Sequence, residues 1–318
     1  MEKILWGDSV IILANYGKFN WAGLGDIFRQ SLRSFYSARG ATLKMKCLVC
    51  DGQMVRKQQW LYACANCGFC SSNLPPGGGR GIEGLEVLRR RNFASLCEWL
   101  GKRFSLPGKK VLEIGCAEGW FLEEARQRGM VACAIEPSPP HAEISRAKGF
   151  VVMDGFFPDD MTAPGAFDFI IFNDVFEHLP NPEAALGRCE ELLNSGGILV
   201  LNLPSNRGFI YRLASLLARV GQTHALERLW QKGFPSPHLS YFNPETLQRF
   251  VDRYSRLRHV GTFCLDTLVA DGLWERIQAS HPGIAGRFVY ASLRLVLPVF
   301  RLLPKDIVLG IFEKQSHH

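Results

Sequence analysis

Four cysteines stand in two closely spaced pairs in the first quarter of the chain. Cys47 and Cys50 form one C-x-x-C pair, and Cys64 and Cys67 form a second after an interval of thirteen residues. Two such pairs can each supply two thiolates from a tight turn to one tetrahedral zinc ion, and no ligand position then stays open. The spacing therefore predicts a structural zinc site, with four reduced, metal-free cysteines as the alternative.

A second stretch, Val111–Phe121, carries an acid and two glycines. A short apolar run containing Glu113 leads to Gly115 and Gly119, after which a helix is predicted. Glycine lets the backbone pass close to a ligand with no Cβ in the way. The E-x-G-x-x-x-G spacing differs from the dinucleotide-binding G-x-G-x-x-G turn and from the phosphate-binding P-loop. It resembles the first motif of the class I S-adenosylmethionine-dependent methyltransferases, whose loop wraps the amino-acid end of the cofactor.

This resemblance implies a set of cofactor-binding residues along the following strands. The next buried strand ends at Glu136, and a carboxylate there can accept hydrogen bonds from both ribose hydroxyls. The third strand leads into a turn that flanks the adenine in the family. The implied cofactor-binding residues are Glu113, Gly115, Cys116, Ala117, Gly119, Glu136, Asp154, Gly155, Phe156 and Asn173.

Three further patterns extend the resemblance over about residues 85 to 260. They are F-D-x-I from Phe167, E-H-L-x-N-P from Glu177, and L-L-x-x-G-G-x-L from Leu192. A hydride-transferring Rossmann enzyme is the structural rival. The glycine spacing and the absence of a Tyr-x-x-x-Lys pair argue against that rival.

Four residues at the predicted carboxyl ends of the strands are candidates for catalysis: Asp174, Glu177, His178 and His238. Transfer of a methyl group to a hydroxyl or an acidic carbon requires proton removal, for which a histidine is suited. His178 is our first candidate for the base and His238 the second. A purely structural role for His178 stays open, and so does a divalent ion bound by Asp174, Glu177 and His178.

Strands and helices alternate after residue 110, which predicts an α/β fold. We expect a Rossmann-like, seven-stranded, mostly parallel sheet with a small zinc ribbon before it. The combination resembles a bacterial group that includes sugar C-methyltransferases. The predicted parts are an N-terminal extension (1–46), the zinc ribbon (47–74), a Gly/Pro linker (75–84) and a methyltransferase domain (85–318) with insertions at about 207–237 and 265–305.

Composition is that of a globular protein, with 47% apolar and 21% charged residues and a net charge of +7. There is no signal-peptide pattern and no apolar run long enough to span a bilayer, so a cytoplasmic location is expected. Segment 287–305 is apolar and basic and contains no acidic residue. That composition suits a helix lying on the inner face of an anionic membrane, a buried helix or a subunit interface.

The resulting functional prediction is a methyltransferase that uses S-adenosyl-L-methionine and acts on a small-molecule, sugar or lipid-like acceptor, with Zn²⁺ in a structural role. An RNA methyltransferase that binds RNA through the ribbon and the basic N-terminus is the main alternative. A scaffold that binds the cofactor without turnover is the other. The sequence does not identify the acceptor atom or the oligomeric state.

Overall fold

The computed structural model describes residues 45–78, 84–162, 165–265, 267, 269–280, 283–300 and 302–315. Most of the predicted N-terminal extension and the centre of the Gly/Pro linker lie outside the described residues. Among the described residues, no helix is both long and apolar enough to cross a membrane.

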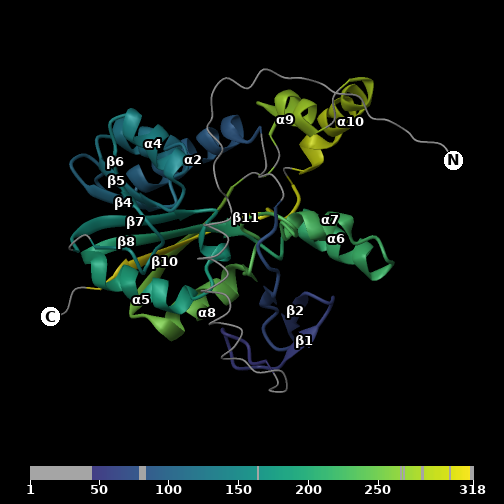
Figure 1. The fold of residues 1–318 in the computed structure, drawn as a ribbon, viewed down its shortest axis with the longest axis horizontal. Coiled ribbons are helices and arrows are strands. Elements are labelled where there is room, and N and C mark those ends of the chain that lie inside the picture. The colour runs from purple at the N-terminus through teal and green to yellow at the C-terminus, as the bar shows by residue number, and fades with distance from the viewer. Residues whose placement is uncertain are drawn as a thin grey trace.

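A seven-stranded sheet forms the centre of the molecule, in the order β10-β11-β8-β7-β4-β5-β6 (Figure 1). The five strands from β4 to β8 pair parallel, whereas β11 is antiparallel to both of its neighbours. The predicted α/β fold with a mostly parallel sheet is therefore confirmed. The strands are β4 (Lys110–Ile114), β5 (Val131–Glu136), β6 (Val151–Asp154), β7 (Phe167–Asn173), β8 (Leu193–Pro204), β10 (Leu257–Leu265) and β11 (Ile307–Lys314).

Helices cover both faces of this sheet, because alternate strand residues point to opposite sides. Val111 belongs to the core beneath one set of helices, and its neighbour Leu112 belongs to the core on the other side. The first set is α2 (Glu86–Gly101), α3 (Trp120–Gln127) and α4 (Pro139–Ala147), and the second is α5 (Pro182–Leu192) and α8 (Pro244–Tyr254) (Figure 1).

A second, four-stranded sheet contains the ribbon region, in the order β1-β2-β3-β9. Its first three strands are β1 (Met54–Arg56), β2 (Leu61–Cys64) and β3 (Cys70–Ser72). The fourth, β9 (Ser240–Tyr241), comes from the other end of the chain and pairs antiparallel with β3. The ribbon sheet is thus completed by a strand from the predicted methyltransferase domain, which the sequence did not indicate because β9 is only two residues long.

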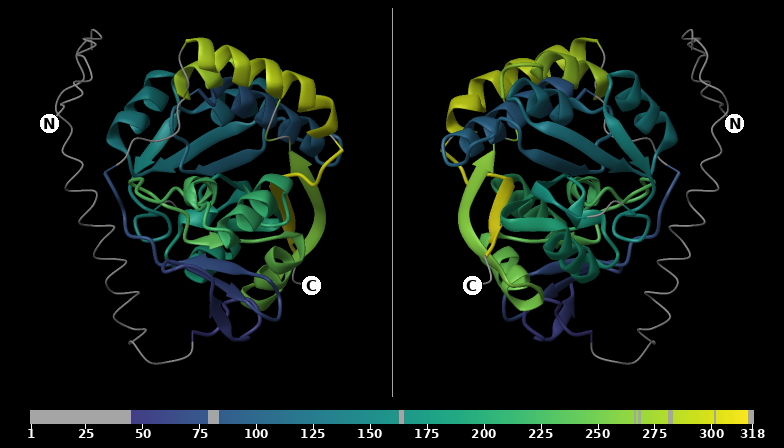
Figure 2. Two further views of the ribbon diagram at one scale, coloured as in Figure 1. Left: turned by 90° about the vertical axis from the view of Figure 1, so that its right-hand side faces the viewer. Right: turned by 90° about the vertical axis from the view of Figure 1, so that its left-hand side faces the viewer.

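Two helical insertions lie between strands of the central sheet. One comes after β8 and contains α6 (Phe209–Arg219) and α7 (His224–Leu229). The other precedes β11 and contains α9 (Leu273–Ser280) and α10 (Ile284–Phe300). Figure 2 shows α10, in yellow, at the outer surface of the molecule above the blue α2. An ion pair between Arg91 and Asp271, 2.5 Å apart, ties this second insertion to α2.

Candidate active site and cysteine cluster

The turn between β4 and α3 depends on two glycines in left-handed backbone conformations. Gly115 has a φ of 72° and Gly119 a φ of 73°. A Cβ on Gly115 would lie 2.7 Å from a methyl group of Val175, and a Cβ on Gly119 would lie 2.7 Å from the Ser145 hydroxyl. Both positions therefore require glycine for conformation and for space.

Three polar side chains cross the carboxyl ends of β4, β7 and β8. The Asn173 amide donates to Glu113 Oε1 at 2.9 Å, and the Asn202 amide donates to Asn173 Oδ1 at 3.0 Å. All three side chains are buried. Burial raises the pKa of Glu113 well above its usual range, although the bond from Asn173 opposes this. Glu113 Oε2 has no hydrogen-bond partner among the described residues.

Asn202 was missed in the sequence analysis. The sequence feature that could have identified it is a single amide side chain in the otherwise apolar run Ile198–Leu203. A polar residue in a central strand requires partners, and here it supports Asn173, which the family resemblance did identify.

The carboxylate of Glu136 connects the end of β5 to the glycine turn. Its Oε2 accepts a hydrogen bond from the Ala117 amide and its Oε1 accepts one from the Ser138 amide, each at 2.9 Å. Burial raises the pKa of Glu136, and these two backbone bonds oppose the rise. Each carboxylate oxygen has more than one lone pair, so Glu136 can still accept from ribose hydroxyls.

The turn after β6 lies farther toward the surface. The side chain of Asp154 is 62% exposed and forms a 2.7 Å ion pair with Arg146. Gly155 has a φ of 137°, and a Cβ there would lie 2.3 Å from the Cβ of Asp160. Asp160 in turn accepts a hydrogen bond from the Phe156 amide at 2.7 Å. The turn is thus shaped by Asp160, which the sequence analysis did not single out.

Glu177, His178 and His238 form one cluster. Glu177 and His178 belong to the 3-10 helix Phe176–His178, and His238 lies two residues before β9. The Nε2 atoms of both histidines lie 3.9 Å from Glu177 Oε1. The two imidazole rings meet edge to face, with centroids 4.6 Å apart. The structure therefore brings together three of the four predicted catalytic residues.

Hydrogen bonds fix both rings of this cluster. His178 Nδ1 lies 3.0 Å from the Pro237 carbonyl and therefore carries the proton, which leaves Nε2 as an acceptor facing Glu177. The Gln231 amide nitrogen is 2.8 Å from His238 Nε2. Burial lowers the pKa of His178 to about 4 and that of His238 well below its usual value. Both rings are thus neutral near pH 7.

The Glu177 carboxylate is 1% exposed, and neither of its oxygens has a hydrogen-bond partner among the described residues. Burial raises its pKa well above the usual range. A buried carboxylate without partners is costly, and a bound proton or a cation would relieve this cost. One ligand atom from each of Glu177, His178 and His238 lies within 4.8 Å of the others, so this cluster could hold a divalent ion.

Asp174, the fourth predicted catalytic residue, lies beside this cluster rather than in it. Its carboxylate forms a 3.5 Å ion pair with Arg89 of α2, and its backbone has a φ of 55°. In the divalent-ion alternative, His238 rather than Asp174 accompanies Glu177 and His178.

The glycine turn and the histidine cluster adjoin each other. Val175, whose methyl group limits the space at Gly115, precedes the 3-10 helix that carries Glu177 and His178. A ligand wrapped by the turn and an acceptor next to the histidines would therefore lie on the same edge of the sheet, at the carboxyl ends of its parallel strands.

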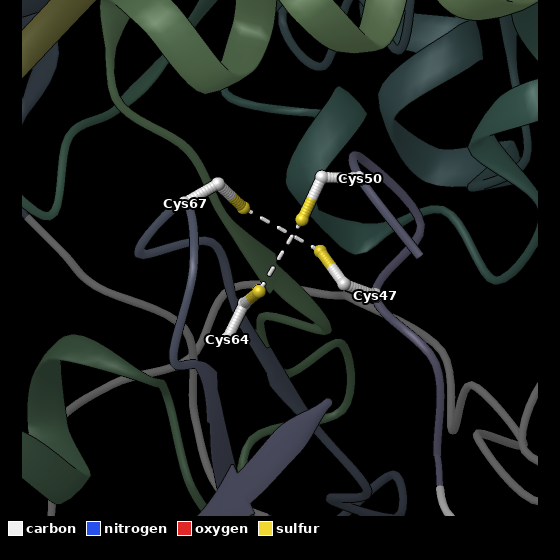
Figure 3. A group of neighbouring side chains, drawn as sticks. All are labelled: Cys47, Cys50, Cys64 and Cys67. Carbon is white, nitrogen blue, oxygen red and sulfur yellow. Dashed lines mark hydrogen bonds between the residues drawn. The ribbon is translucent and has the colours of Figure 1, made fainter. Parts of the chain in front are cut away.

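Figure 3 shows the four sulfur atoms of the two C-x-x-C pairs converging on one point. Cys47 Sγ is 3.5 Å from Cys67 Sγ, and Cys50 Sγ is 3.5 Å from Cys64 Sγ. Four thiolates bound to zinc at about 2.3 Å would be roughly 3.8 Å apart, which is close to these separations. The residues present fit a tetrahedral zinc ion.

The fifth cysteine of this region, Cys70, is buried and its thiol faces the Gly68 carbonyl. It does not belong to the group of four that could share a metal ion.

The cysteine-rich sheet contacts the segment that carries His238. Ser72 Oγ donates to the His238 carbonyl at 2.6 Å, and the pairing of β3 with β9 fixes the next residues. His238 is therefore positioned by the ribbon and by the insertion helix α7, whose C-terminal end at Trp230 accepts a bond from the His238 amide.

The comparisons with known proteins agree with this geometry. The family described as "Methyltransferase domain" matches residues 88–254, more than half of the chain. The chain belongs to this family. Together with the sheet and the glycine turn, this makes it a class I S-adenosylmethionine-dependent methyltransferase.

Relatives in this family include two proteins named "Ubiquinone biosynthesis O-methyltransferase". The one from Xylella fastidiosa is 30% identical over 171 residues, which is 52% of this chain and 65% of that protein. The one from Xanthomonas campestris is 30% identical over 124 residues, which is 37% of this chain and 52% of that protein. The chain thus matches between about half and two thirds of these relatives' own length.

Among solved structures, the complex of the Trm112 methyltransferase activator with a methyltransferase from Haloferax volcanii is similar in fold. The TM-score is 0.51 with 12% identity, over 74% of this chain and 94% of the matched chain.

The site fits the cofactor of this family. The two left-handed glycines leave room for a ligand against the backbone, and Glu113 Oε2 is a buried acceptor without a partner among the described residues. Acidic groups at the ends of adjacent strands, Glu136 and Asp154, are paired in register. Glu113, Glu136 and the turn would hold the cofactor, which supplies an activated methyl group when bound.

Proposed function

We propose that the protein transfers a methyl group from S-adenosyl-L-methionine to a small, lipid-like acceptor that carries a hydroxyl group. The observation that carries this proposal is the neutral histidine pair beside Glu177, placed next to the glycine turn through Val175. The names of the relatives, which act in ubiquinone biosynthesis, support an O-methyl acceptor of apolar character.

The chain's own contribution would be alignment and proton removal. When bound, the cofactor would supply an activated methyl group, and the residues of this chain would hold the acceptor oxygen in line with it. The hydroxyl proton must leave the acceptor, and an imidazole nitrogen that is neutral at pH 7 can take it. His178 presents Nε2 as an acceptor, and Glu177 beside it would stabilise the imidazolium that forms. His238 is the second candidate.

We further propose that Cys47, Cys50, Cys64 and Cys67 bind a structural zinc ion. All four positions of a tetrahedral ion would be filled by thiolates, so no position remains for a substrate or water. The zinc would therefore act on the stability of the ribbon and, through Ser72, on the placement of His238.

The acceptor class is tested by methyl transfer from labelled cofactor into separated lipid, glycan and RNA pools. Label in the lipid or quinone-like fraction is expected. Label that enters only RNA and is lost as salt rises would contradict the proposal, because salt sensitivity is typical of phosphate contacts.

A parallel assay with EDTA tests whether the histidine cluster binds a metal ion or removes a proton. Activity that EDTA abolishes and a divalent ion restores would favour metal binding over proton transfer.

Replacing His178 and His238 separately by Gln tests the base. Loss of a general base typically costs about 100-fold or more in turnover, and we expect this for at least one variant, with cofactor affinity changed by less than about threefold. The half-buried His259, on β10 and outside the cluster, provides the matched control: His259→Gln should behave as wild type. Unchanged turnover in both cluster variants would refute the assignment.

A further inference from the structure

The outer surface of α10 carries an apolar stripe that faces away from the protein. Ile284, Phe288, Leu295 and Val299 are between 56% and 81% exposed, and Leu302 just beyond the helix is 87% exposed. These positions are spaced by multiples of about one helical turn, so they share one side of the helix. The opposite side, including Leu297, packs on α9.

Helix α6 of the first insertion repeats this arrangement. Leu213, Leu216, Leu217 and Val220 follow the i, i+3, i+4, i+7 spacing and are between 38% and 74% exposed. Its other side, including Tyr211, packs against the ribbon sheet. Exposed apolar residues scattered singly are common in soluble proteins, but two helical stripes of this kind mark an interaction surface.

Both helices are basic and contain no acidic residue. Arg287 and Arg294 are exposed on α10 and lie on one flank of its stripe, and Arg212 and Arg219 are exposed on α6. An apolar stripe flanked by arginines matches a bilayer that carries anionic headgroups, since the apolar side chains enter the acyl boundary and the guanidinium groups remain at the headgroups.

The two helices adjoin each other at one edge of the fold. The rings of Phe209, at the start of α6, and Phe300, at the end of α10, meet at right angles with centroids 5.5 Å apart. The strands that lead to them also pair, Pro204 of β8 with Ile307 of β11. Both helices lie on the same side of the molecule, toward which the parallel strands point their carboxyl ends (Figure 1).

We infer that α6 and α10 together dock the protein onto an anionic lipid bilayer, in the plane of the interface. At seventeen residues, α10 is shorter than the twenty or so that a spanning helix needs. A second copy of the chain is a poorer occupant, because facing copies would bring arginines of the same charge together.

Docking would turn the carboxyl edge of the sheet, with the glycine turn and the histidine cluster, toward the lipid. An apolar acceptor could then reach the site from the bilayer without crossing water. The delivery of an acceptor from the bilayer rests on the proposed lipid-like acceptor. The docking of α6 and α10 on the bilayer does not.

Vesicle cosedimentation of the full chain tests the inference. Wild type should bind vesicles that contain phosphatidylglycerol and bind pure phosphatidylcholine vesicles weakly. Arg287→Gln/Arg294→Gln should weaken binding on the order of 30-fold, because each basic residue at an anionic surface contributes roughly fivefold. Phe288→Ser/Leu295→Ser should also weaken it.

Matched variants on other surfaces test whether vesicle binding depends on this face or on the overall charge and hydrophobicity of the protein. Arg249 and Arg256 are exposed arginines in and after α8, and Val131 and Val151 are exposed valines in β5 and β6. Arg249→Gln/Arg256→Gln and Val131→Ser/Val151→Ser should bind vesicles as wild type does. Circular dichroism confirms that each variant is folded.

Equal loss in the matched variants, or no vesicle binding by wild type, would overturn the inference. Self-association of wild type that Phe288→Ser/Leu295→Ser abolishes, with no vesicle binding, would assign the face to a second copy instead. Methyl transfer to a water-soluble acceptor with vesicle binding intact would overturn only the proposed acceptor, so the two failures are distinguishable.

Discussion

At the scale of single residues, burial determines the chemistry of the site. Glu113, Glu177 and His238 are buried, and each has at least one polar atom without a partner among the described residues. Such atoms are costly in a folded protein unless a ligand, proton or ion satisfies them. Their concentration around the glycine turn and the histidine pair is what distinguishes this edge of the sheet.

The glycine turn gives the first residue-scale prediction. Gly119→Ala should weaken cofactor binding at least tenfold, because a Cβ would strain a left-handed backbone and press on Ser145. Isothermal titration with S-adenosyl-L-methionine measures this. Gly187→Ala, in α5, is the matched control: its Cβ would meet no atom within 4 Å, and cofactor affinity should not change. Normal cofactor affinity in Gly119→Ala would remove the turn from the cofactor site.

The histidine cluster predicts a pH dependence of stability. The pKa of His178 falls from its ordinary 6.5 to about 4 because the ring is buried. The unfolded chain therefore binds a proton first on acidification, so the stabilising contribution is complete above pH 6.5 and is lost as pH falls toward 4. At pH 5 the loss is about 2 kcal/mol in the free energy of unfolding.

Urea unfolding at pH 7.5 and pH 5.0 measures this loss. His178→Gln should lose less stability than wild type between the two pH values, by about the same 2 kcal/mol, and His259→Gln should follow wild type. If wild type and His178→Gln lose the same free energy of unfolding between the two pH values, His178 is not held neutral by burial.

At the scale of elements, the ribbon sheet is the part that joins distant segments. Strand β3 pairs with β9, and Ser72 holds the carbonyl of His238. The aromatic residues Trp60 of the ribbon and Trp230 of the first insertion also meet, with ring centroids 5.8 Å apart. The ribbon thus supports one wall of the candidate site.

Zinc removal is the prediction that belongs to this scale. Cys50→Ser should lower the zinc content well below about one ion per chain and lower the melting temperature, because structural zinc contributes folding free energy directly. Methyl transfer should fall with it, since His238 depends on the ribbon. Zinc is measured by mass spectrometry. Cys264→Ser, at an exposed cysteine, should keep zinc and activity; loss of zinc there, or retention in Cys50→Ser, would contradict the assignment.

At the scale of the whole molecule, the two insertions share one edge with the active site. The insertion after β8 begins at the carboxyl edge of the sheet. The insertion before β11 ends at the same edge, because β8 and β11 pair there. Ligands of open α/β sheets bind at the carboxyl ends of the parallel strands, which is this edge. The same edge therefore combines the cofactor turn, the histidine cluster and the two basic apolar helices.

Much of the fold followed from local patterns. The turn at Gly115 and Gly119 and the alternation of strands and helices after residue 110 were both recognisable in the sequence and are present in the structure. Helix caps are local in the same way: Asn243 accepts a hydrogen bond from the Thr246 amide at 3.0 Å at the start of α8. Short-range signals of this kind depend only on neighbouring residues.

The partners of individual side chains were not predictable in this way. Asn202 and Asp160 became important only once strands and turns were placed side by side, and Asp174 proved to pair with Arg89 beside the histidine cluster. The pairing of β3 with β9 had no local signal, since two residues are too few to show a strand pattern.

The sequence by itself determined the class of protein, because the glycine turn, the acid at Glu136 and the paired cysteines are short motifs whose chemistry resides in their spacing. Only the tertiary structure decided which residues share the site. It joined His238 to Glu177 and His178, and it left the apolar stripes of α6 and α10 exposed. Burial and exposure arise from contacts between segments far apart in the chain, which spacing does not record.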